Sequence, residues 1–123
     1  MSSEPQNRYD GSTIEETLAR LPGDLVGDAV PLWGVVSKGN QAFGLTGNAL
    51  TDFVRRGILA ILREGGEPVV GAKGRIGWDR VDYGSSSDAI VDAIIKEWIA
   101  SGGGTHTDPR GLWFALPEEI DRP

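Results

Sequence analysis

The chain has 123 residues, of which 39% are hydrophobic, no cysteine and a formal net charge of −6. This length fits one domain with its own core, and the lack of cysteine excludes disulfides, thiolate metal sites and cysteine nucleophiles. The negative charge argues against a nucleic-acid partner and favours a basic protein. Without a membrane-spanning apolar run or a signal-peptide pattern, we expect a cytoplasmic protein with no membrane contact.

Residues 1–11 are polar and predict a flexible leader, followed by a single domain over residues 12–118. Ser12 and Glu15 have the spacing of a capping box, in which each side chain satisfies a free backbone N–H of the first turn. The spacing predicts a short helix that Pro22 ends.

Residues 30–46 are rich in Val, Trp and Phe on both sides of a Lys-Gly-Asn triplet at 38–40. Two β-rich segments around residues that tolerate a tight turn are typical of a β-hairpin. The sequence therefore predicts two paired strands here.

Residues 46–66 carry the strongest helical periodicity in the chain. Thr46 or Asn48 can cap the start, and Gly65 can end the helix in a left-handed conformation. Gly57 falls on the apolar stripe, where we expect it to let another backbone approach closely. The stripe consists of Leu50, Phe53, Val54, Gly57, Ile58, Ile61 and Leu62.

The second half alternates short β-like segments with one more helix. Residues 67–72 predict a strand, and residues 74–84 predict a second strand or an extended loop. Ser85 and Asp88 have a spacing close to a capping box ahead of a further helix. Residues 112–117 predict a covered strand because they are apolar on both faces. The helix expected after Ser85 has its apolar face at Val91, Ile94, Ile95 and Trp98.

Residues 119–123 predict an exposed acidic tail. The order of elements favours an α+β fold with about three helices packed on a mainly antiparallel or mixed sheet of four to five short strands.

The best candidate for a binding surface is a group of carboxylates with an aromatic among them. Aromatic side chains anchor protein interfaces, and charges steer association with a partner of opposite sign. The alternative is a solvated surface with the aromatics in the core. The candidate partner-binding residues are Asp79, Asp82, Tyr83, Asp88 and Asp92.

The four tryptophans are many for a chain of this size. Each falls in an expected helix or strand, which favours core packing, although a ligand pocket among them is the alternative. They are Trp33, Trp78, Trp98 and Trp113.

These observations predict a small acidic protein-binding module, with no enzyme activity, cofactor or metal. An immunity-type inhibitor that neutralises a basic toxin is one concrete form, by analogy of size, acidity and missing catalytic motifs. An exposed strand edge in residues 30–46 or 67–72 could support a homodimer.

Two alternatives remain open. The helix, glycine turn and β-branched strand in "FVRRGILAILREGGEPVV", closed by "GLWFALP", resemble a winged-helix nucleic-acid-binding regulator. That function requires one shared basic face. A small hydrolase-type enzyme could instead use His106 and Asp108, with hydroxyls from residues 85–87. The basic face that the winged-helix function requires would comprise Arg55, Arg56, Arg63, Lys73 and Arg75.

Overall fold

A computed structural model describes residues 5–105, 107 and 110–122. This part of the chain contains five α-helices, two short helical turns and four strands. The α-helices are α1 (Ile14–Arg20), α2 (Leu32–Ser37), α3 (Gly47–Arg63), α4 (Ser87–Ala100) and α5 (Pro117–Ile120). The turns are η1 (Leu21–Leu25) and η2 (Lys38–Ala42), and the strands are β1 (Val30–Pro31), β2 (Glu67–Gly71), β3 (Trp78–Arg80) and β4 (Trp113–Ala115).

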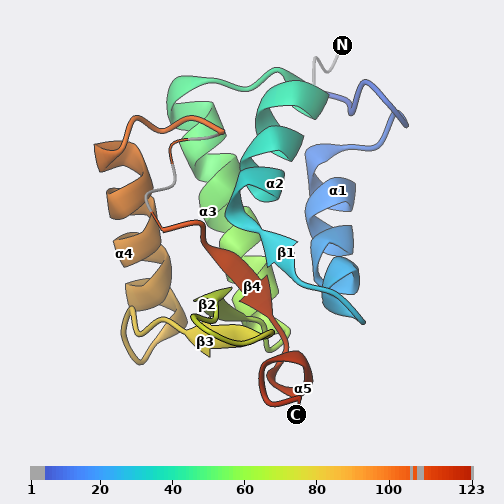
Figure 1. Cartoon of the computed structure of the whole chain (residues 1–123). Helices are drawn as coiled ribbons and strands as arrows, with labels where there is room; N and C mark the ends of the chain where they lie inside the picture. Colours follow the sequence, from blue (N-terminus) through green and yellow to red (C-terminus); the bar gives the residue numbers. More distant parts are fainter. Residues whose placement is uncertain (1–4, 106, 108–109, 123) are drawn as a thin grey trace.

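The four strands form one antiparallel sheet in the order β1-β4-β2-β3. Figure 1 shows the sheet lying across α3, with α4 and α1 on either side of that helix. The α+β class is therefore confirmed, and the sheet is antiparallel rather than mixed. The helices of the described residues outnumber the three expected, because α2 and α5 form where a hairpin and a tail were predicted.

Strand register separates the two faces of the sheet. Val30 pairs with Phe114, and both side chains lie in the main core beneath the helices. Val69 pairs with Trp113 on the opposite, outer face. That outer face has its own small cluster of Ala29, Val69, Ala115 and Ile120, against which Trp78 and Trp113 pack. The sheet therefore has a helix-covered face and a thinly covered one.

The predicted hairpin in residues 30–46 is wrong, because most of this segment is helical. Leu32, Val35 and Val36 recur at helical spacing and are buried, so tertiary packing overrides their β propensity. Gly39 is buried in η2, where an added Cβ would lie 2.6 Å from the Phe53 ring. This glycine permits close packing and does not form a hairpin turn.

The stripe predicted on α3 is confirmed, since all of its residues are buried except the half-buried Leu62. Gly57 is closely approached by side chains and not by another backbone. A Cβ at this position would lie 2.8 Å from Val35 Cγ1 and 3.1 Å from Leu21 Cδ1. Gly65 ends the helix with φ +95°, as expected, whereas Thr46 caps its start without a side-chain hydrogen bond.

Both predicted helix caps lie one residue further along the chain than expected. The capping box of α1 joins Thr13 and Glu16, and the N-cap of α4 is Ser86, whose hydroxyl accepts from the Ala89 N–H. In both places adjacent residues offered similar side chains. Thr13 and Ser86 have the extended backbone of an N-cap residue, which places the side-chain hydroxyl oxygen next to a free N–H of the first turn.

The expected exposed tail begins inside α5, where Pro117 takes the first helical position. Ile120 is buried against the outer face of the sheet. No helix among the described residues is long and apolar enough to cross a membrane.

Candidate functional site

The candidate acidic residues do not form one uniformly charged surface. Asp79 of β3 forms an ion pair with Arg75, and Asp92 of α4 forms one with Arg55. Such pairing cancels much of the charge that a basic partner would meet. Asp82 and Asp88 are exposed and have no ion-pair partner within the described residues.

Tyr83 is held within the protein itself. Its hydroxyl donates to Glu97 of α4 at 3.3 Å, and the Arg110 guanidinium lies 5.5 Å from its ring centroid. Arg110 also forms an ion pair with Glu97 at 2.8 Å. These contacts give Tyr83 a structural role within the fold.

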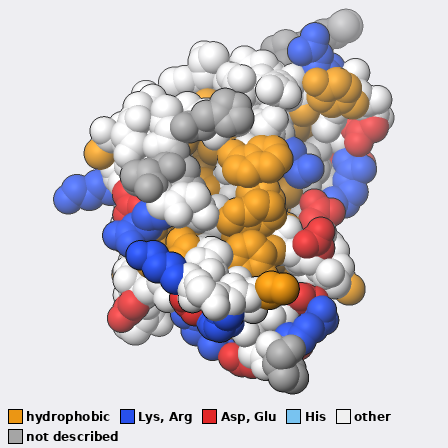
Figure 2. Space-filling model, viewed as in Figure 1, with side chains coloured by type: hydrophobic (Ala, Val, Ile, Leu, Met, Phe, Trp, Pro, Cys, Tyr) orange, Lys and Arg blue, Asp and Glu red, His pale blue; other side chains and the backbone are white. Residues whose placement is uncertain are grey.

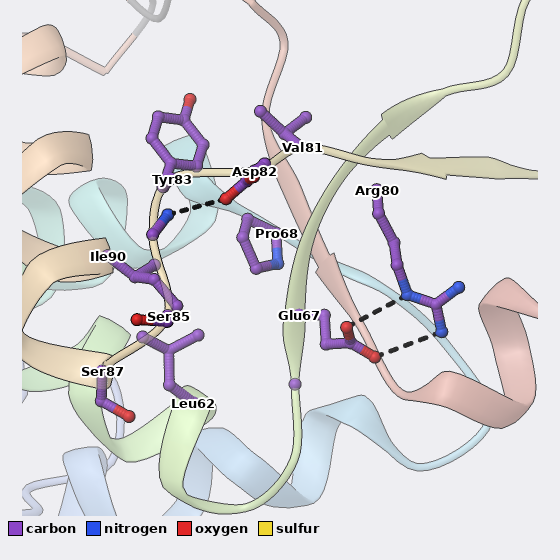
Figure 3. Close-up of a pocket in the computed structure, with 12 residues that line it drawn as sticks. Leu62, Glu67, Pro68, Arg80, Val81, Asp82, Tyr83, Ser85, Ser87 and Ile90 are labelled. Atoms are coloured by element: carbon purple, nitrogen blue, oxygen red, sulfur yellow. Dashed lines mark hydrogen bonds and ion pairs between the residues drawn. The ribbon is translucent and has the colours of Figure 1, made fainter.

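Asp82 and Tyr83 meet at the rim of a hollow of about 360 Å³ between β2, β3 and the start of α4, which we call the β3–α4 hollow. Leu62, Pro68 and Ile90 give it apolar walls, and Figure 3 shows the Tyr83 hydroxyl pointing away from them. The Asp82 carboxylate accepts from the Gly84 N–H at 2.9 Å. Asp79, Asp88 and Asp92 do not line this hollow.

Arg80, at the other side of the same hollow, is fixed by two carboxylates. It donates to Glu67 at 3.1 Å and to Asp121 at 2.9 Å (Figure 3 shows the Glu67 pair). These hydrogen bonds raise the pKa of the Arg80 guanidinium and lower the pKa of the Asp121 carboxyl. Arg80 therefore ties β3 to β2 and to the residue after α5, and its charge is already compensated.

Three of the four tryptophans form a continuous row on the outer face of the sheet, which we call the tryptophan row: Trp33, Trp113 and Trp78. The centroids of Trp33 and Trp113 lie 6.4 Å apart, and those of Trp113 and Trp78 lie 5.5 Å apart. Trp33 is 47% exposed, and the other two are half-buried. Figure 2 shows a band of hydrophobic side chains down the middle of this side, over β1 and β4.

Trp98 behaves differently from the row. It is buried in the main core, and its indole N–H donates to the Gly104 carbonyl at 2.9 Å. Core packing was therefore the correct expectation for this tryptophan. Successive residues of a strand face opposite sides of the sheet, so one of Trp113 and Phe114 in β4 faces outward. Both are apolar, so the sequence did not show which one.

One end of the tryptophan row borders a second hollow, of about 500 Å³, which we call the Trp33 hollow. Trp33 and Ser37 line it together with Asp24, Asp28 and Lys38. Neither carboxylate has an ion-pair partner within the residues described, although Asp28 accepts from the Ala29 N–H at 2.8 Å. The hollow therefore joins an exposed indole to two carboxylates and one ammonium, which leaves a net negative charge.

The described residues of the two alternative functions are not assembled into a site. His106 and Asp108 lie outside the described residues, and Ser86 is occupied as a helix cap. Among the described residues, no group of three His, Asp or Glu side chains could hold a metal ion. Of the basic candidates, Arg56 pairs with Glu15, and Arg55 and Arg75 are paired as described above.

Comparison with models of known protein families, with curated proteins and with solved structures found no match. A function must therefore be argued from the surface itself.

Proposed function

We propose that this protein is a small acidic protein-binding module that receives a basic partner on the outer face of its sheet. The observation that carries the proposal is the tryptophan row, where three neighbouring indoles remain accessible. Tryptophan is enriched among the residues that dominate binding energy at protein interfaces. Exposed aromatic area that adjoins carboxylates suits a partner with apolar and cationic groups.

The sheet face can serve this purpose because the fold does not need it covered. The main core lies on the opposite face, between the sheet and the helices. On the outer face, α5 covers only one end through Ile120. A partner would cover the remaining apolar surface without disturbing the core.

The acidic residues identified from the sequence have a supporting role in this proposal. Asp82 and Asp88 keep their charge free to steer a basic partner by long-range attraction. Asp79 and Asp92 have arginine partners and contribute less. Neutralisation of a toxin, as by an immunity-type inhibitor, remains the concrete form that we propose for this binding.

A peptide library displayed on phage and selected against the immobilised protein tests the proposal. We expect the enriched peptides to carry net positive charge and to lose about tenfold or more in affinity for Trp33→Ser, as for a binding hot spot. Ile99→Ser is the matched control, because Ile99 is 51% exposed on α4 and outside the tryptophan row. Peptides that bind Trp33→Ser as well as the wild type, or no enrichment, would contradict the proposal.

Binding of duplex DNA distinguishes the winged-helix alternative. A basic recognition face would give affinity that falls steeply as salt concentration rises. We expect no such binding in fluorescence anisotropy, because three of the candidate cations are ion-paired to carboxylates. Micromolar binding with a steep salt slope would favour a nucleic-acid regulator.

A further inference from the structure

We infer that the Trp33 hollow receives a cationic side chain, an arginine or lysine of the partner segment that covers the tryptophan row. This inference rests on the proposed function and identifies the site that binds a positively charged group of the partner. Its basis is the meeting of an exposed indole with two carboxylates that have no ion-pair partner among the described residues, in one hollow.

The side chains of the hollow offer complementary contacts to a cation with an apolar stem. The face of an indole attracts a guanidinium or ammonium group through its quadrupole. Asp24 lies in η1, and Asp28 lies between η1 and β1, so both carboxylates border the hollow from one chain segment. Arginine and lysine also bury their aliphatic stems against apolar surface, which Trp33 supplies.

Lys38 is the one cation in the wall, and its ammonium has no ion-pair partner among the described residues. It also lines a neighbouring hollow with Asp10 and Asp24. Two carboxylates against one ammonium leave the Trp33 hollow net negative. The same arithmetic predicts that removing Lys38 strengthens binding of a cation, whereas removing either carboxylate weakens it.

The sheet supports a partner that extends beyond one side chain. Trp33 joins the hollow to Trp113, and Trp113 leads on to Trp78. A segment that places its cation beside Trp33 therefore continues over an apolar surface. A second copy of this acidic chain would bring further negative charge to Asp24 and Asp28, which disfavours a homodimer through this face.

The test is a nuclear magnetic resonance titration with acetyl-Gly-Arg-Gly-amide and with its citrulline counterpart, which has nearly the same shape without the charge. We expect the arginine peptide to shift the Trp33 indole N–H and the Ala29 amide, and the citrulline peptide to shift them much less. Asp28→Asn keeps an oxygen for the Ala29 N–H and should weaken arginine binding about two- to fivefold, as for one exposed ion pair.

Two further variants make the outcome decisive. Lys38→Met should strengthen arginine binding, and Glu64→Gln, which makes the same change in net charge as Asp28→Asn at an exposed residue next to the end of α3, should leave it unchanged. Equal shifts with citrulline, or arginine shifts centred on Asp82 and Asp88, would overturn the inference. If the selected phage peptides still depend on Trp33 in that case, the protein-binding function stands and only the cation site fails.

Discussion

Trp33 of α2 meets Trp113 of β4 edge to face, with ring planes at 87°. The two indoles differ in how much of the fold depends on them, because Trp33 is about half exposed and Trp113 packs on the outer cluster. We expect Trp33→Ser to cost at most about 1 kcal/mol of unfolding free energy and Trp113→Ala to cost roughly 3 kcal/mol. Urea unfolding measures both, and equal costs would show that Trp33 is structural.

Gly57 of α3 faces Val35 of α2 and Leu21 of η1. Alanine would gain about 1 kcal/mol of helix propensity, but its Cβ would press on the fully buried Val35 and Leu21. Overpacking costs about 1–3 kcal/mol, so we expect Gly57→Ala to be destabilising by about 1 kcal/mol in thermal unfolding. Combining it with Val35→Ala should cost less than the sum of the two single changes. Stabilisation by Gly57→Ala alone would contradict this packing.

Thr13 caps α1 through its hydroxyl, which accepts from the Glu16 N–H at 3.1 Å. The Glu16 carboxylate in turn accepts from the Thr13 N–H at 2.9 Å. We expect Thr13→Ala to cost about 1 kcal/mol in urea unfolding and Thr13→Ser to cost much less, because serine keeps the acceptor oxygen. If both variants lose the same stability, the methyl group and not the cap is responsible.

Arg80 lowers the pKa of the Asp121 carboxyl, chiefly through a hydrogen bond. A carboxyl with a lowered pKa in the folded state adds stability above its unfolded pKa, and this contribution is lost as the pH falls below about 4. We expect Arg80→Gln to return the Asp121 titration midpoint upward to its ordinary value, as followed by carbon resonances of the carboxyl group.

Asp10 is the control for that titration. Its pKa is lowered by hydrogen bonds from Ser12 and by Arg20, independently of Arg80. Its midpoint should therefore stay low in Arg80→Gln. If the Asp121 midpoint also stays low, another group holds that carboxylate.

The regular elements with strong local periodicity could be predicted from the sequence. The stripe of α3 recurs over about three turns and the apolar face of α4 over about two, and β2 and β4 coincide with short segments rich in Val or aromatic residues. The segment of α2 could not be predicted locally. Val35 and Val36 favour strands, and only their burial beneath α3 selects a helix.

The residue types of the candidate site could be read from the sequence, but the contacts between them could not. Acidity and aromatic content led us to expect a basic partner. Arg55 and Asp92 are 37 residues apart, so their ion pair could not be predicted from their spacing in the sequence. Likewise, Trp33, Trp78 and Trp113 come from separate elements. They meet because β2 places β3 near β4 in the sheet, and because α2 directly follows β1, which pairs with β4. The sequence could not show which tryptophans remain accessible.

Indoles this close share their electronic excitations, so the row has an optical consequence. Circular dichroism of the protein should contain a coupled aromatic signal superimposed on that of the backbone, and helix content read from the spectrum alone would then be distorted. The distortion should diminish in Trp33→Ser without any change in backbone structure.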